Sequence, residues 1–140
     1  MRRATMIAAA LLCGCGSVLH GSLTADWQTQ GKHWSMTPDE CESGERSGFF
    51  GVDLSTQGSD AVRIRAILDP ADGPIVKLEL AGVDPPLTLT PASACKTFEF
   101  HVERQGSRTN KIADVRGHLV LDCTERDLAL QADISFSDCH

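Results

Sequence analysis

Aromatic side chains are scarce in this sequence, whose 140 residues include five Phe, two Trp and no Tyr. No apolar run reaches the roughly 20 residues that a membrane-spanning helix requires. The nucleophile elbow, the phosphate-binding loop, the dinucleotide fingerprint and the H-E-x-x-H zinc helix are also missing. The short apolar runs argue against an uncleaved transmembrane anchor, and the missing motifs argue against the enzyme classes that carry them. We therefore expect a non-enzymatic protein that needs no cofactor.

Basic residues are fewer than acidic ones, 13 against 19, which gives a formal charge of −6. Removing residues 1–14 would leave 11 basic and 19 acidic residues, a charge of −8. Such acidity disfavours nucleic acid as a partner. The hydrophobic content of 41% and the charged content of 23% are ordinary for one globular domain.

The N-terminal segment has the order of an export signal. Basic residues open it at Met1-Arg2-Arg3, an apolar run follows at residues 4–12, and Gly14 stands just before Cys15. The stretch Leu12-Cys13-Gly14-Cys15 resembles the lipobox of bacterial lipoproteins, with Cys13 as a departure from the usual small residue.

This resemblance implies cleavage before Cys15 and attachment of a diacylglycerol to its sulfur, which would hold the protein stably at a membrane. It also implies a signal peptide at 1–14. Residues 16–26 are rich in Gly, Ser and Thr, so we expect a lipidated tether at 15–26, followed by a single β-domain at 27–140. Gly16 stands where inner-membrane lipoproteins often carry Asp, so we expect the outer membrane, with the domain facing the periplasm or the cell surface. An ordinary secretory signal with an incidental Cys15 is the alternative.

Four cysteines remain in the mature chain, an even number outside the reducing cytoplasm, which predicts two disulfides. They are Cys41, Cys95, Cys123 and Cys139. A zinc site is the competing interpretation, but their spacings contain no C-x-x-C pair.

Seven short segments look like β-strands, because apolar residues alternate within them and turn-forming residues separate them. They are 49–55, 61–69, 75–81, 87–90, 97–104, 115–123 and 128–136. No convincing helix follows the signal. The pattern predicts an all-β fold, an antiparallel β-sandwich of about seven short strands with two disulfides.

The last strands also suggest a register. A tight turn at Glu125-Arg126 would leave Cys139 level with Ile112, eleven residues or about 36 Å along the strand from Cys123, too far for a disulfide. The pairs this turn predicts are Leu121 with Leu130, Leu119 with Ala132 and Cys123 with Leu128.

A second turn near Thr109-Asn110 would bring Cys95 close to Cys123. The pairs it predicts are Phe98 with Leu121 and Phe100 with Leu119. Of the three possible pairings we therefore predict Cys95 with Cys123 and Cys41 with Cys139.

The same register places His101 opposite His118 on the polar face of the sheet, with Glu99, Glu103 and Asp122 nearby. Imidazoles and carboxylates in this arrangement could bind zinc or copper. A solvated polar face is the alternative, because outward residues of a half-buried strand are expected to be polar.

A second candidate surface is aromatic. Trp27, Trp34, Phe49 and Phe50 occur early in the mature chain and could form a platform for a glycan or a partner protein, although core packing is the commoner fate of such residues.

Together these features predict a membrane-anchored envelope lipoprotein whose domain is a non-enzymatic binding or structural module, with an envelope protein or glycan as partner. A metal-binding envelope protein using His101 and His118 is the first alternative. A hydrolase with dispersed catalytic groups is the second.

Overall fold

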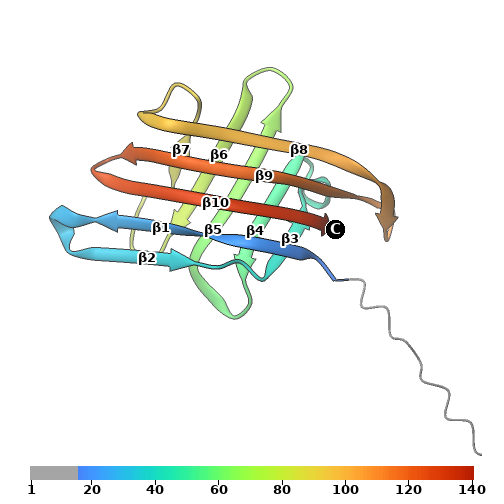
Figure 1. The fold of residues 1–140 in the computed structure, drawn as a ribbon, viewed down its shortest axis with the longest axis horizontal. Coiled ribbons are helices and arrows are strands. Elements are labelled where there is room, and N and C mark those ends of the chain that lie inside the picture. Colours follow the sequence, from blue (N-terminus) through green and yellow to red (C-terminus); the bar gives the residue numbers. More distant parts are fainter. Residues whose placement is uncertain (1–15) are drawn as a thin grey trace, which may run out of the picture.

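The computed structural model describes residues 16–140, which form two antiparallel sheets packed face to face (Figure 1). The terminal sheet, which holds the first and last strands, has the order β2-β1-β10-β9-β8. Its strands are β1 (Val18–Trp27), β2 (Lys32–Met36), β8 (Cys95–Thr109), β9 (Ile112–Glu125) and β10 (Leu128–Cys139). The middle sheet has the order β3-β4-β5-β6-β7. Its strands are β3 (Glu40–Ser43), β4 (Gly51–Thr56), β5 (Ser59–Asp69), β6 (Gly73–Leu80) and β7 (Leu87–Leu89).

These two sheets confirm the predicted all-β sandwich, and each of the seven predicted segments contributes a strand. The strand number is higher than predicted, because β1, β2 and β3 also form. Two short 3₁₀ helices complete the described chain, η1 (Gln28–Gln30) and η2 (Gly44–Ser47).

The predicted tether at residues 15–26 is wrong over most of its length, because it overlaps β1. β1 lies between β10 and β2 and forms a ladder with each of them. Only Leu23 and Ala25 are fully buried in it, and Gly, Ser and Thr fill much of the rest, so its apolar alternation is too short to indicate a strand. Pairing along both edges provides the backbone hydrogen bonds that its composition alone does not favour. The domain therefore begins near residue 18, not at residue 27.

The β8–β9 hairpin has the predicted register at its disulfide end, where Phe98 pairs with Leu121. Its turn lies one residue later than predicted, at Asn110-Lys111, where both residues have positive φ (50° and 69°). A register shift between Arg104 and Arg108 accommodates the difference.

The predicted register of the β9–β10 hairpin is wrong by two residues. Leu121 pairs with Ala132 and not with Leu130, because the turn falls at Arg126-Asp127. Both turn residues have positive φ (49° and 62°), as a two-residue hairpin turn of type I′ requires. Side chains alternate with a period of two, so a two-residue shift keeps every apolar side chain on the predicted face.

Both predicted disulfides are present. Cys95–Cys123 joins the neighbouring strands β8 and β9. Cys41–Cys139 joins β3 of the middle sheet to β10 of the terminal sheet, with a Cα–Cα distance of 5.2 Å. Cys139 lies level with Val115, three residues beyond the predicted position, which follows from the corrected register and a bulge in β10. It still lies eight residues along the ladder from the level of Cys123, about 26 Å at the usual strand rise.

The core fills the space between the sheets, whose strands cross one another in Figure 1. Fully buried leucines and isoleucines from both sheets meet there, among them Leu54, Ile64 and Leu78 of the middle sheet and Leu119, Leu130 and Ile134 of the terminal sheet. Within residues 16–140, no helix has the length and apolar character needed to cross a membrane.

Candidate functional site

A cleft of about 460 Å³ opens beside the segment that joins β3 to β4. Its apolar wall includes Phe49, Phe50 and Ile67, and its rim carries Glu45 and Arg104. The cleft thus combines partly exposed aromatic surface with charges of both signs, a composition typical of binding sites.

Local backbone geometry holds the two phenylalanines at this cleft. The 3₁₀ helix η2 is followed by Gly48, whose φ of 81° favours glycine. The chain then turns back, and the Phe49 N–H donates to the Gly44 carbonyl at 3.1 Å. The Phe49 ring lies so close over Gly44 that a Cβ there would collide with it. On the other side, the Leu68 N–H donates to the Phe50 carbonyl at 2.8 Å.

Each phenylalanine carries an arginine over its ring. The Arg65 guanidinium lies 4.8 Å from the centre of the Phe49 ring, and Arg104 lies 4.6 Å from that of Phe50. Two hydrogen bonds to Asp53, of 2.8 and 2.9 Å, fix the Arg65 side chain. The bond to this carboxylate raises the pKa of Arg65 above its ordinary value, so the guanidinium stays charged.

Two carboxylates of the cleft already accept backbone hydrogen bonds. Glu45 Oε2 accepts the N–H of Ala113 at 2.8 Å, which ties η2 to the terminal sheet. Asp69 Oδ1 accepts the N–H groups of Asp72 and Ala71 at 2.9 and 2.8 Å. These bonds lower the pKa of Asp69. Asp69 therefore shapes the turn between β5 and β6.

The four aromatic residues considered together in the sequence do not form one platform. Trp34 is buried, and its Nε1–H donates to the Ala81 carbonyl at 3.2 Å. Trp27 packs, partly buried, against the core cluster. Only Phe49 and Phe50 contribute to the cleft.

The two candidate metal-binding histidines lie directly opposite each other, as predicted, His101 in β8 and His118 in β9. His118 Nε2 lies 2.7 Å from Asp133 Oδ1. His101 Nε2 lies 4.0 Å from Glu103 Oε2, while the other oxygen of Glu103 accepts from Arg116 Nε at 2.5 Å. Glu103 is therefore paired with Arg116 of the neighbouring strand, whereas Asp133 is paired with His118 itself.

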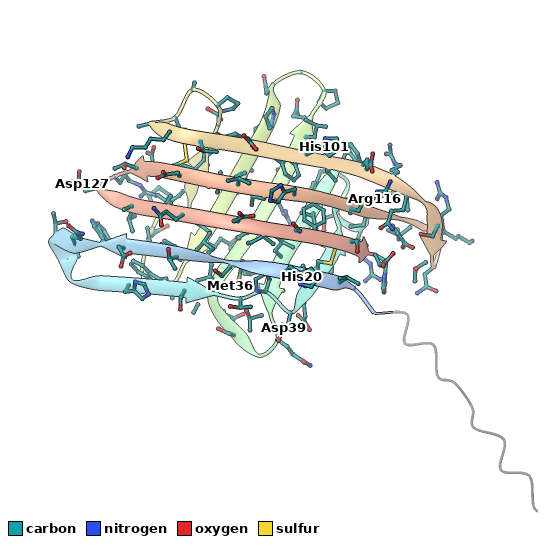
Figure 2. All side chains as sticks on the ribbon, viewed as in Figure 1. His20, Met36, Asp39, His101, Arg116 and Asp127 are labelled. Atoms are coloured by element: carbon teal, nitrogen blue, oxygen red, sulfur yellow. A yellow bond between two sulfur atoms is a disulfide. The ribbon has the colours of Figure 1, made fainter. Side chains whose placement is uncertain are left out.

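A third histidine extends this pair into a row across four strands. Ser135 of β10 pairs with His118, and His20 of β1 pairs with Ser135. Figure 2 shows His20 and His101 on the terminal sheet. No group of three or more His, Cys, Asp or Glu side chains in residues 16–140 has a geometry that could hold a metal ion. Metal binding at this row stays a prediction.

Comparison of the chain with protein-family models, with curated proteins and with solved structures gives no match. The cleft and the histidine row must therefore be judged on their own geometry. Cys15, the predicted lipidation site, lies outside the residues that the structure describes.

Sequence reasoning missed the residues that complete both sites. Arg65 lies on β5, and nothing in the sequence around an outward-facing arginine on a strand indicates that it covers the ring of Phe49, 16 positions earlier. His20 was assigned to the tether, so it had no predicted neighbours. Only the pairing of β1 with β10 places it in the histidine row.

Proposed function

We propose that this chain is a lipid-anchored envelope protein, placed at the outer membrane, whose β-sandwich is a non-enzymatic binding module for an envelope protein or polysaccharide. The lipobox-like stretch ending at Cys15 supports the anchor. The two disulfides support a location outside the reducing cytoplasm, where such bonds form and persist.

The observation that carries the binding role is the cleft beside Phe49 and Phe50. Phenylalanine rings that stay partly exposed, next to a hollow of about 460 Å³, offer apolar area that a partner can bury. The arginines over the rings and the disulfide-linked scaffold fix this surface before a partner arrives. A preformed surface loses less conformational entropy on binding.

Binding fits this cleft better than acid–base catalysis, because two of its carboxylates already accept hydrogen bonds from backbone N–H groups. Glu45 accepts an N–H from Ala113, and Asp69 accepts two from its own turn. A general acid active near neutral pH needs a raised carboxyl pKa, whereas the pKa of Asp69 is lowered.

The anchor is tested by labelling with radioactive palmitate in the native host. We expect label on the wild-type chain and none on the Cys15→Ser variant. Equal labelling of the two, or an intact wild-type mass without acyl chains, would refute the anchor.

The cleft is tested by crosslinking the protein in its own envelope and quantifying the captured partner. Phe49→Ser removes a partly exposed ring of the cleft, and Val18→Ser is the control, because Val18 is an exposed apolar residue that does not line the cleft. We expect capture to fall about tenfold or more in Phe49→Ser only, since an aromatic anchor commonly contributes at least ~1.4 kcal/mol. Digestion of the captured material with protease or glycosidase tells protein from polysaccharide. Equal capture by all three proteins would refute the cleft.

A second candidate function is metal binding at the histidine row, favoured by the direct pairing of His101 with His118. Imidazole suits zinc and copper. Titration with Zn²⁺ and Cu²⁺ would compare the wild type with the His101→Ala/His118→Ala double variant. His33→Ala is the matched control, because His33 lies on β2 and bonds to Asp26. Equal binding by the wild type and the double variant would remove this candidate.

A further inference from the structure

We infer that the tip of the β8–β9 hairpin contacts the anionic lipid headgroups of the membrane that holds the protein, with Arg108 and Lys111 as the contact residues. This inference rests on the proposed lipid anchor. It adds an orientation: the domain would lie with one defined end against the bilayer.

The first supporting observation is where the described chain begins. Gly16, the residue after Cys15, lines a hollow of about 430 Å³ together with Ser107, Arg108 and Thr109 of the hairpin. Consecutive Cα atoms lie 3.8 Å apart, so an acyl chain on Cys15 would enter the bilayer close to this hairpin. Figure 1 shows the hairpin, the start of β1 and the C-terminus at the same end of the molecule.

The second observation is charge. The mature chain would carry a formal charge of −8, yet residues 104–113 contain three cations and no acidic residue. Arg108 and Lys111 are both exposed. The first cation of the stretch, Arg104, lies over Phe50 and belongs to the cleft. The other two have no acidic residue beside them in this stretch and can face a surface of opposite charge.

Arg108 and Lys111 lie at the turn that joins β8 to β9. Positive φ at Asn110 and Lys111 makes the tight turn, and Arg108 donates to the Lys111 carbonyl at 2.7 Å. Two acidic residues line the same hollow as Arg108, but Asp114 is buried, and Asp138 accepts from Gln105 at 2.9 Å. Within residues 105–112 the charged residues are these two cations, and both are exposed.

Anionic headgroups attract such residues at short range. Each lysine or arginine near an anionic bilayer raises the equilibrium constant for contact with the surface roughly fivefold. The attraction decays within a Debye length of about 8 Å at physiological ionic strength. A tip held beside the acyl anchor lies within this range. Two such residues would raise about 25-fold the ratio of molecules whose hairpin tip contacts the bilayer to molecules whose tip does not.

The test uses the full acylated protein in vesicles of neutral phosphatidylcholine, and in the same vesicles with about a third phosphatidylglycerol. Amide hydrogen exchange of residues 105–112 is the readout. We expect exchange at the tip to slow at least fivefold in the anionic vesicles, and high salt to reverse it. Arg108→Gln/Lys111→Gln should abolish the slowing. The control Arg63→Gln/Lys77→Gln removes equal charge from exposed positions of the middle sheet and should behave as wild type.

The outcomes separate this inference from the proposed function. An intact mass without acyl chains refutes the anchor and the inference together. An acylated protein whose tip exchanges equally in both vesicles refutes the inference alone. Slowing in neutral vesicles, or equal loss in the control variant, also refutes it, because the contact would then not depend on these two cations.

Discussion

Replacing Cys41 and Cys139 with alanine should cost more stability than replacing Cys95 and Cys123. The Cys41–Cys139 bridge joins the two sheets of the sandwich and links residues 98 positions apart. The Cys95–Cys123 bridge lies within the terminal sheet, where β8 and β9 already form an extensive ladder, and it links residues 28 positions apart.

The magnitudes follow from the chain entropy that each bridge removes from the unfolded state. For closed loops of these lengths the estimate is about 4.7 kcal/mol for Cys41–Cys139 and about 3.6 kcal/mol for Cys95–Cys123. Domains of this size commonly have unfolding free energies of 5–15 kcal/mol. We therefore expect the Cys41→Ala/Cys139→Ala variant to lie close to the limit of stability.

Urea unfolding followed by the fluorescence of buried Trp34 and by circular dichroism measures both double variants against the wild type. The m-value should rise in each variant, because a chain with one fewer bridge unfolds to a more open state. The reasoning would be refuted if loss of Cys95–Cys123 costs as much as, or more than, loss of Cys41–Cys139.

Three further predictions concern single residues. Gly117→Ala should lower the free energy of unfolding by about 2 kcal/mol or more, because its Cβ would collide with the His101 carbonyl and lie 2.7 Å from the Phe136 ring. Asp114→Val should raise it by about 1 kcal/mol, because Asp114 Oδ1 is buried and has no hydrogen-bond partner in residues 16–140. Asp69→Ala should destabilise the protein at neutral pH, and the difference from wild type should shrink in acid. The pKa of Asp69 is lowered in the fold, so its contribution is present above the ordinary aspartate range and is lost as pH falls through the folded-state pKa.

Thermal and urea unfolding check these three variants. Gly106→Ala is the control for Gly117→Ala, because nothing lies within 4 Å of a Cβ at Gly106, and it should be close to neutral. A stability loss above 1 kcal/mol in Asp114→Val would mean that this carboxylate is paired. A pH-independent difference for Asp69→Ala would show that its two backbone hydrogen bonds do not depend on charge.

Much of the fold could be predicted from local patterns. Alternating apolar residues indicated the strands from β4 to β10, and the spacing of Cys95 and Cys123 about a tight turn indicated their disulfide. The predicted register of the β9–β10 hairpin was wrong, because turn chemistry decided it. Arg126-Asp127 adopts positive φ at both positions, which the residue types permit but do not demand.

The candidate sites were less predictable, because they depend on contacts between distant segments. Phe49 and Phe50 were recognised as aromatic candidates, but their separation from Trp34 and Trp27 depends on which rings the core covers. Arg104 reaches Phe50 only because β8 of one sheet lies near the β3–β4 connection of the other. No local pattern encodes that proximity.

By itself, the sequence determined that the chain is an all-β protein with four paired cysteines, because side-chain period and cysteine number are local or compositional properties. It also supplied the N-terminal pattern that predicts an export signal, on which the proposed anchor depends. Tertiary structure decided that residues 18–27 form a central strand of a sheet, that four strands place three histidines in one row, and that the Cys41–Cys139 bridge joins the two sheets. Those features arise from pairing and packing between segments far apart in the chain, and their free energy appears only when both partners are in place.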